Sequence, residues 1–455
     1  MPITALPPIA DNLALPSSEP DDLSLARELT LFDALAVNAG IMLSAVVFVA
    51  PAFVLANVGT GWLSAAAWAT AGGISWCGAV SLAELGVLFP RPGGPYVYLA
   101  RAYSQFWGFL YGWTTVAVIQ SASIAAVAVA SLTYLGAFWS LGPRATTSGA
   151  VGLSLALSAW NASGMRLSLG GQRAAAGAKV ALLTLVAIGC VWYGGAGAET
   201  FRALAPTAPV SRTVAGFAAA VTIALWSLSG WTSLTFVAGE IQRPEHTLPR
   251  AMSYSVIGTT ALALAVTTGF LWAIPLDVAI GSDQIAMAAA ARVFNRLGGG
   301  LLTLTIVVTC VAAVNGLLFT GGRLIYAMAR DGLFPTGLGA VSRRKVPAHA
   351  IFFQGLWASI LTLTGRFDQL FTAVVVAVWL FSMLGAYAVV VLRHRLPDRP
   401  RPYQVAGYPY VPVLFGTVAW ALLLYTLWNS PGDAAIGLVV MLAGVPAYLY
   451  WTRRT

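Results

Sequence analysis

The chain has 455 residues, of which 58% are hydrophobic and only 9% are charged, and its formal net charge is +9. Soluble proteins carry roughly a quarter charged residues, so this composition excludes a water-soluble globular chain and indicates a protein that lipid surrounds. The positive charge does not indicate nucleic-acid binding, because the basic residues lie in short stretches between apolar runs, as they do in membrane proteins.

The first 27 residues are rich in Pro, Ser and Asp and lack the basic-then-apolar pattern of a cleaved signal peptide. We expect a disordered cytoplasmic tail here. The first apolar run then acts as an uncleaved insertion signal.

Apolar runs long enough to cross a bilayer, which takes about 20 residues, follow one another along the rest of the chain. The predicted spans lie near 31–57, 61–89, 106–136, 147–164, 173–195, 213–239, 250–275, 300–329, 348–364, 368–392, 409–429 and 432–451. The fourth and ninth runs are the shortest. The sequence therefore predicts an all-α integral membrane protein with twelve transmembrane helices.

The basic residues divide unevenly between the two sets of predicted loops. With the N-terminus inside, most of the 25 Lys and Arg residues fall on the cytoplasmic side. Positively charged loops stay in the cytoplasm during insertion, so we expect both termini to be cytoplasmic. The Ala- and Gly-rich spans and compact loops favour a prokaryotic plasma membrane.

Two predicted spans contain a stretch that weakens a helix. The first has Ser44-Ala45 seven residues before Pro51, and the sixth has a Ser/Gly cluster between Trp226 and Trp231. Unwinding in mid-membrane would free backbone amides and carbonyls and point helix dipoles at a ligand. Close helix packing through small residues is the alternative. If spans 1–5 and 6–10 are inverted repeats, the two stretches correspond, which is typical of a transporter site.

Three ordered stretches carry long motifs. Residues 83–98 read AELGVLFPRPGGPYVY, residues 229–251 read SGWTSLTFVAGEIQRPEHTLPRA, and residues 323–335 read RLIYAMARDGLFP. Together they resemble the signatures of the amino acid–polyamine–organocation (APC) superfamily, especially its L-type amino acid transporter-like branch. The resemblance implies a LeuT-type 5+5 inverted repeat with helices 1 and 6 broken. Residues 28–395 would form this ten-helix transport core, and residues 396–455 two additional C-terminal helices.

The resemblance implies a sodium-independent secondary transporter of amino acids that works by alternating access, either as a proton-coupled symporter or as an exchanger. A carrier of polyamines or other organic amines, and a channel or non-transporting sensor on the same scaffold, are left open. An enzyme is disfavoured, because no His, Cys or carboxylate set converges within the spans. No cofactor or metal ion is expected. The expected partners are a small-molecule substrate, the lipid bilayer and protons.

The resemblance also implies a binding site at the two breaks. The predicted substrate-binding residues are Ile41, Ser44, Ala45, Val46, Trp226, Ser227, Leu228, Ser229 and Gly230. Trp226 would be an aromatic gate over the substrate, with simple packing as the alternative. The family has Gly-Ser-Gly where this chain has Ser44-Ala45-Val46. Without glycine a positive φ is costly and a carboxylate approaches less closely, so an amine or a differently posed ligand is also open.

Lys179 is the only lysine within a predicted span, seven residues after Gln172. A charge in the membrane interior costs about 2.5–3.5 kcal/mol on insertion scales, so a role is expected. In sodium-independent members of the family such a lysine stands in for a sodium ion and bonds the first and eighth helices. A side chain that gains and releases a proton there could couple transport to a proton gradient. The alternative is snorkelling to the cytoplasmic interface, which Arg173 marks about 10 Å away along the helix.

Four further residues are assigned to gating or structure. Glu84 and Glu240 lie at the cytoplasmic ends of the second and sixth spans, and we expect them to anchor loops or the inner gate. Arg323 on the eighth span is expected to pair with such an acid. Asn315, deeper in that span, either lines the pathway or packs between helices.

The cysteines Cys77, Cys190 and Cys310 all fall within apolar runs, where we expect free structural thiols. Members of the resembled family that bond covalently to a single-span partner use a cysteine between the third and fourth spans. Residues 140–145 contain no cysteine. No disulfide-linked partner subunit is therefore expected.

Overall fold

The computed structural model describes residues 25–202, 210–280, 282, 284–365, 367–429 and 431–453. Most of the predicted tail, residues 1–27, lies outside this part. Within the described residues the chain forms helices and no β-strand, and a single parallel bridge joins Leu29 to Ile241. The predicted all-helical fold is confirmed.

The helices follow the predicted spans closely. In chain order they are α1 (Leu31–Ile41), α2 (Ala50–Val58), α3 (Gly61–Leu88), α4 (Pro95–Ala102), α5 (Gln105–Thr114), α6 (Gln120–Trp139), α7 (Pro143–Ala162), α8 (Met165–Tyr193), α9 (Ala198–Arg202), α10 (Val210–Ser227), α11 (Pro244–Ala273), α12 (Leu276–Ile280), α13 (Ile285–Phe294), α14 (Arg296–Arg330), α15 (Ala348–Thr364), α16 (Phe367–Arg395), α17 (Tyr410–Asn429), α18 (Pro431–Leu442) and α19 (Gly444–Thr452). Tighter 3₁₀ turns form η1 (Ala45–Phe48), η3 (Trp231–Glu240) and η4 (Thr336–Gly339), and a wider π-helical turn forms η2 (Thr115–Ile119).

Nine helical segments of the described part are long and apolar enough to cross a membrane. They are Gly61–Leu88, Gln105–Gly136, Met165–Tyr193, Arg212–Glu240, Pro244–Ala273, Leu297–Arg330, Val375–Arg395, Tyr410–Asn429 and Ala434–Thr452. Shorter apolar helices include α1 and α15. A multi-pass membrane protein is confirmed, and the number of twelve spans stays a prediction.

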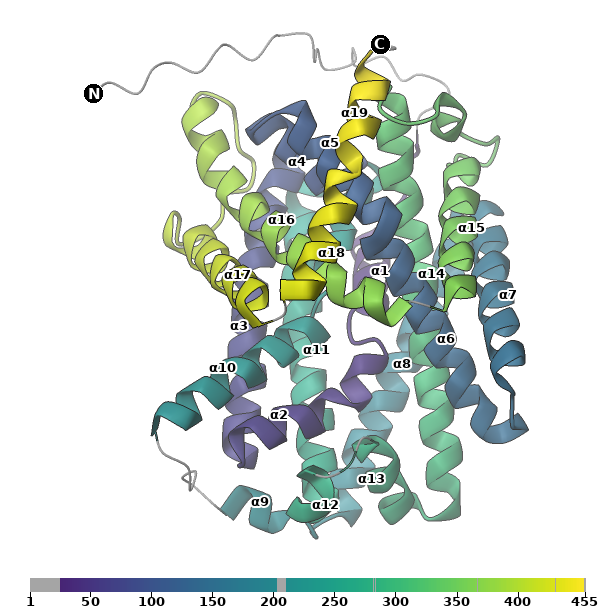
Figure 1. The fold of residues 1–455 in the computed structure, drawn as a ribbon, viewed down its shortest axis with the longest axis vertical. Coiled ribbons are helices and arrows are strands. Elements are labelled where there is room, and N and C mark those ends of the chain that lie inside the picture. The colour runs from purple at the N-terminus through teal and green to yellow at the C-terminus, as the bar shows by residue number, and fades with distance from the viewer. Residues whose placement is uncertain are drawn as a thin grey trace.

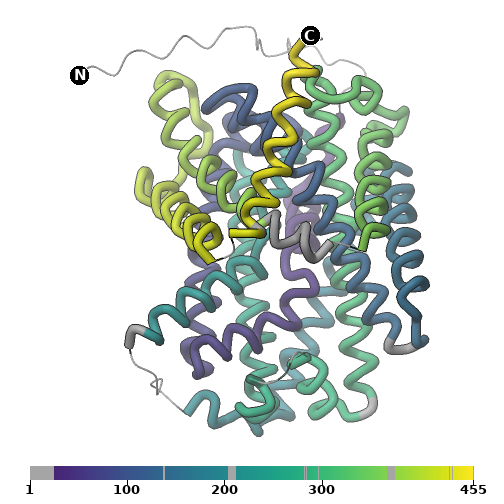
Figure 2. The backbone as a smooth tube through the Cα atoms, viewed as in Figure 1, coloured from purple at the N-terminus to yellow at the C-terminus, as the bar shows by residue number. Residues whose placement is uncertain are grey.

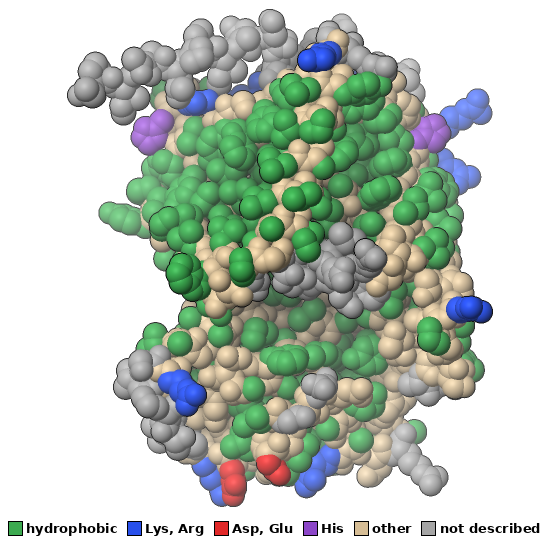
Figure 3. Space-filling view, in the orientation of Figure 1, with side chains coloured by type: hydrophobic (Ala, Val, Ile, Leu, Met, Phe, Trp, Pro, Cys, Tyr) green, Lys and Arg blue, Asp and Glu red, His purple; other side chains and the backbone are tan. Residues whose placement is uncertain are grey.

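The surface of the bundle agrees with a lipid environment. Hydrophobic side chains cover most of the face in Figure 3, and charged side chains lie mostly toward its two ends. On α8, Leu185, Ile188 and Val191 are each about half exposed, whereas Leu183 and Val186 are buried. One side of the helix therefore faces lipid and the other faces the core. We name the two ends of the bundle after α4 and α13, which lie at opposite ends in Figure 1.

The first predicted span is interrupted in its middle. Helix α1 ends at Ile41, the chain runs non-helically over 42–44, and η1 and α2 follow. Leu43 has a φ of 51°, a conformation that costs a non-glycine residue roughly 1–2 kcal/mol. The packing around this break must therefore hold it in place.

The sixth predicted span is interrupted at the same depth. Helix α10 ends at Ser227, and η3 starts at Trp231. Gly230 between them has a φ of 105°, and a Cβ there would lie 2.8 Å from Ile41 Cγ2. Glycine is required by both its backbone angle and the close approach of the first break. The two breaks thus face each other, and α2 and α10 pack side by side below them (Figure 2).

Candidate functional site

The two breaks border a cavity of about 480 Å³. The first break contributes Ile41, Leu43, Ser44, Ala45 and Val46, and the second contributes Trp226, Ser227, Ser229 and Gly230. Helix α6 supplies Ser123, Ala126, Val127, Val129, Ala130, Thr133 and Tyr134, and α14 supplies Ala313 and Leu317. Of the predicted substrate-binding residues, only Leu228 does not line this cavity, because its side chain is buried in the adjoining hydrophobic core.

A second cavity of about 170 Å³ lies next to the first, between the second break, η2 and α16. Ser123, Trp226, Ser229, Gly230 and Leu317 line both. Trp226 therefore lies at the boundary between the two cavities. No charged side chain is among the residues that line either cavity.

The first break presents backbone amides. Within the described residues, no backbone carbonyl accepts a hydrogen bond from the amides of Ser44, Ala45 or Val46. The amide of Ala45 donates to the Cys310 sulfur, which leaves those of Ser44 and Val46. These groups stand at the start of η1, where backbone amides have no carbonyl partner within the turn. A carboxylate is the group that such amides bind best.

The second break presents backbone carbonyls. Two of its amides are paired: Leu228 N–H donates to Ala224 O at 3.0 Å, and Ser229 N–H donates to Trp226 O at 3.1 Å. In the described part of the chain, the carbonyls of Ser227 and Leu228 receive no backbone N–H. They stand at the negative end of α10, so they favour a cation. The cavity is thus bordered by backbone hydrogen-bond donors on one break and backbone acceptors on the other.

Lys179 is buried on α8, and its ammonium caps the end of α1. Its Nζ donates to Ala39 O at 2.9 Å, to Gly40 O at 3.1 Å and also to Met42 O. A cation at the C-terminal end of a helix satisfies carbonyls that have no intrahelical donor. These contacts rule out the snorkelling alternative. All three acceptors belong to the first span, although the resemblance had implied bonds to the eighth helix as well.

Asn315 lies in a buried chain of amides. Its Nδ2 donates to Gln172 Oε1 at 2.6 Å, and its Oδ1 accepts from Asn161 Nδ2 at 2.7 Å. Gln172 Nε2 in turn reaches Ala36 O of α1 at 3.3 Å. Through these bonds Asn315 connects α7, α8 and α14 with α1. It is not among the residues that line either cavity.

Glu240 and Arg323 form a fully buried, two-pronged ion pair. Arg323 Nε donates to Glu240 Oε1 at 2.8 Å, and its Nη2 donates to Oε2 at 3.0 Å. The pair ties the end of η3 to α14. The backbone beside it is paired with the start of the first span, because Leu29 N–H donates to Glu240 O at 2.9 Å. The α4-end halves of the two broken spans are therefore joined.

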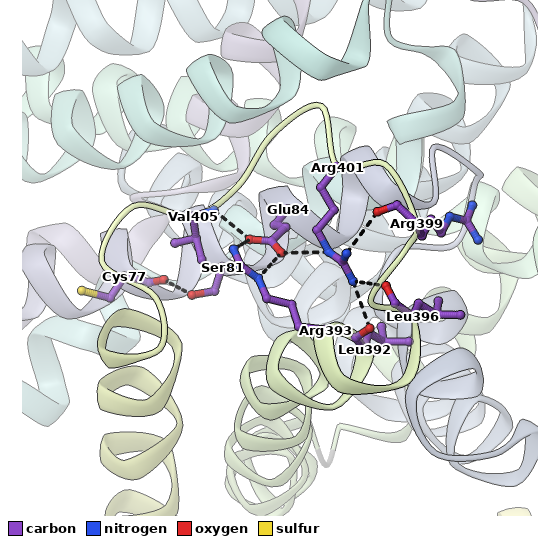
Figure 4. Close-up of polar contacts among 9 residues, drawn as sticks. All are labelled: Cys77, Ser81, Glu84, Leu392, Arg393, Leu396, Arg399, Arg401 and Val405. Atoms are coloured by element: carbon purple, nitrogen blue, oxygen red, sulfur yellow. Dashed lines mark hydrogen bonds and ion pairs between the residues drawn. The ribbon is translucent and has the colours of Figure 1, made fainter.

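Glu84 holds the C-terminal region against α3 (Figure 4). Arg393 donates to both of its oxygens at 2.8 and 2.7 Å, and Val405 N–H donates to Oε2 at 2.7 Å. Arg401 Nε lies 3.7 Å from Oε1. Glu84 lines neither cavity, which agrees with an anchoring role.

A further contact closes the α4 end. Asp331 pairs with Arg91 at 3.2 Å and accepts a hydrogen bond from the Tyr96 hydroxyl at 2.8 Å. Burial, followed by the charge and hydrogen bond of Asp331, raises the pKa of Tyr96 well above its ordinary value. The phenol therefore remains a neutral donor at any physiological pH.

The third span contributes to the cavities, although none of its residues was predicted as a site residue. Gln120, Ser123 and Tyr134 line the cavities but were not predicted as site residues. Gln120 in the middle of an apolar run is the signal that was available, because polar groups within a membrane are usually functional. No group of three or more His, Cys, Asp or Glu residues in the described part could hold a metal ion. Its three cysteines are free.

Residues 29–449 match a family model described as "Amino acid permease". The chain is 28% identical to the serine/threonine exchanger SteT of Bacillus subtilis (strain 168) over 445 residues, which cover 95% of this chain and 99% of that protein. It is 28% identical to b(0,+)-type amino acid transporter 1 of Homo sapiens, over 92% of this chain and 87% of the relative. It is also 29% identical to large neutral amino acids transporter small subunit 2 of Mus musculus, over 96% of this chain and 84% of that protein.

Proposed function

This chain belongs to the amino acid permease family, and we propose from that premise that it is a secondary active transporter of amino acids. The observation that carries the proposal is the cavity between the two breaks, with amides on one side and carbonyls on the other. An α-amino acid carries both complementary charges one carbon apart. Its carboxylate would bind the amides of Ser44 and Val46, and its ammonium would bind the carbonyl of Ser227, which lines the cavity.

Movement would follow from how the breaks are connected. The α4-end halves, α1 and η3, are joined through Leu29 and Glu240, so they are expected to move together. Each break supplies a hinge between them and the opposite halves, α2 and α10. Rocking of one pair against the scaffold would expose the cavity to the two membrane sides in turn. Trp226 would cover the substrate between these states.

The energy source would be exchange or a proton gradient rather than sodium. Lys179 places its own ammonium on the carbonyls at the end of α1, where it would take the place of a bound cation. The relative SteT carries the description exchanger, which supports counter-transport of two amino acids.

An organic amine is the second candidate substrate, because the first break lacks the glycines of its family. The cavities weigh against a polyamine. No carboxylate lines them, so a second ammonium group would be buried without a partner.

The orientation follows from the loop charges. The α4 end, which carries most of the basic residues, would face the cytoplasm of a prokaryotic cell. With no cysteine at 140–145, the protein would work without a disulfide-linked subunit.

Binding to the purified protein tests the substrate class. Labelled L-serine and L-leucine would be displaced by each amino acid, by its decarboxylated amine and by its deaminated acid. We expect displacement by the amino acids at concentrations at least about tenfold lower than by either analogue, since each analogue loses one charged contact. Equal displacement by the amine would replace the amino acid with an organic amine as the substrate.

A further inference from the structure

The third span changes its helical pitch beside the two cavities. Between α5 and α6, η2 is a π-helical turn in which Gln120 N–H donates to Thr115 O, five residues back. Such turns hold one additional residue and are frequent at functional sites. Thr115 and Ile119 of this turn, together with Gln120, line the smaller cavity.

The additional residue changes which side chains share a face. One residue corresponds to about 100° of rotation around a helix, so η2 rotates α6 by about that angle relative to α5. Tyr111 and Thr115 come before this rotation, and Ser123 and Val127 come after it. Both sets line the joined cavities. In a regular helix they would point about a quarter-turn apart, and one set would leave the site.

The wide turn is held from outside by α15. Trp357 Nε1 donates to Ala117 O at 2.8 Å. Gln354 Nε2 donates to Ser121 Oγ at 2.6 Å, and that hydroxyl donates to Val116 O at 2.6 Å. Irregular backbone within a bilayer persists only where its polar groups find partners. Trp357 thus donates directly to one carbonyl of η2, and Gln354 holds the Ser121 hydroxyl that donates to the carbonyl before it.

The same region contacts Trp226, the proposed gate. Val118, Ala122, Ala125 and Leu361 form a small hydrophobic cluster. Trp226 and Trp357 both pack against it. The shape of the wide turn therefore also determines the surface on which Trp226 rests.

We propose that Trp357 is a positioning residue for substrate selection. Its indole N–H stabilises the wide turn at Thr115–Ile119, and the turn brings Thr115 and Ser123 to one cavity wall beside Trp226. Trp357 itself lines neither cavity, so it would act on a substrate only through the wide turn. The consequence for selectivity rests on the proposed amino acid transport, whereas the consequence for the direction of Thr115 and Ser123 does not.

Trp357→Phe removes the N–H and keeps an aromatic ring. Trp62→Phe is the matched control, because Trp62 Nε1 also donates to a backbone carbonyl, that of Phe201 at 2.6 Å, outside the lining of both cavities. Uptake of labelled L-serine and L-leucine gives KM and Vmax for each. We expect Trp357→Phe to change the ratio of the two KM values about fivefold or more, the equivalent of one lost hydrogen bond, with Vmax within about twofold. Trp62→Phe should leave the ratio unchanged.

An unchanged KM ratio in Trp357→Phe, or a loss of Vmax alone, overturns the role in selection. A second readout needs no transport. Thiols introduced singly by Thr115→Cys and Ser123→Cys are reacted with a water-soluble thiol reagent, with the parent chain as background. Trp357→Phe should change the ratio of their two labelling rates about fivefold or more, and an unchanged ratio overturns the positioning. If the wild-type protein takes up neither amino acid, yet Trp357→Phe changes the labelling ratio, the proposed function is contradicted and the positioning role is not.

Discussion

At the scale of single residues, Lys179 joins two helices through a buried charged group. Its ammonium satisfies the carbonyls of Ala39, Gly40 and Met42 where α1 ends. Its position as the one lysine of a predicted span marked it in the sequence, but its partners could not be read there. They lie about 140 residues away and become available only because α1 stops in mid-membrane. The positive φ of Leu43 could not be predicted from the sequence either, because it too depends on the end of α1 in mid-membrane.

Lys179→Ala tests this contact. We expect the rate of amino acid uptake to fall at least about tenfold, because each carbonyl left without a donor costs about 1–3 kcal/mol and the end of α1 would no longer be fixed. The residual uptake should not respond to an inward proton gradient. Proteoliposome uptake at several external pH values, with protein shown by gel filtration to be folded, measures both. Wild-type rates with an unchanged pH response would refute the role in coupling.

The missing glycines of the first break lead to a second prediction at this scale. Ser44 and Val46 both line the main cavity. Their side chains would hinder the close approach of a carboxylate that glycine allows. Ser44→Gly combined with Val46→Gly should lower the KM for α-amino acids several-fold or extend the range of those accepted, although each glycine costs about 0.5–1 kcal/mol of stability. Competition by a panel of amino acids measures the range. An identical panel for variant and wild type would show that these side chains do not restrict the substrate.

At the scale of helices, what the sequence could predict followed from composition. The Ser/Gly cluster around Ser229 and the helix-weakening stretch at Ser44 both lie at the breaks that the structure shows. The wide turn of the third span could not be predicted. Four of its five residues are apolar, as in any membrane helix, and its stabilising partner Trp357 is 240 residues from Ala117. The residue pattern along the sequence predicts local conformation, whereas side chains from distant helices determine where an irregular backbone is stable.

The buried pair of Glu240 and Arg323 gives a prediction for the contact between η3 and α14. Glu240→Gln should lower the free energy of unfolding by about 3–5 kcal/mol, because it leaves Arg323 charged and buried without its partner. Replacing both, as Glu240→Leu with Arg323→Met, should recover most of the loss. Denaturant unfolding in detergent measures the free energy of unfolding of the wild type, of Glu240→Gln and of the double variant.

The exposed pair of Arg166 and Glu28, with 3.9 Å between Arg166 Nε and Glu28 Oε2, is the control for that experiment. Arg166→Gln should cost less than about 1 kcal/mol, as surface pairs do. A similar loss from Arg166→Gln and Glu240→Gln would show that burial does not govern the contribution of the Glu240–Arg323 pair.

At the scale of the whole molecule, the proposed transport needs the α4-end halves of the two broken spans, α1 and η3, to move relative to the scaffold. Contacts at the α4 end, such as the Glu240–Arg323 pair and Asp331 with Arg91, hold that end together in this arrangement. The membrane architecture followed directly from hydropathy, because lipid requires continuous apolar helices. Which contacts join the halves could not be predicted, since they form between side chains far apart in sequence.

Counterflow in proteoliposomes tests the central claim most directly. Vesicles are loaded with unlabelled L-serine or L-leucine, and uptake of the labelled amino acid is followed with and without the internal load. Alternating access predicts that internal substrate accelerates labelled uptake and produces a transient accumulation above the external concentration. Uptake that internal substrate does not accelerate would contradict a carrier and indicate a channel. Tight binding without any uptake would contradict transport altogether and indicate a sensor on the same scaffold.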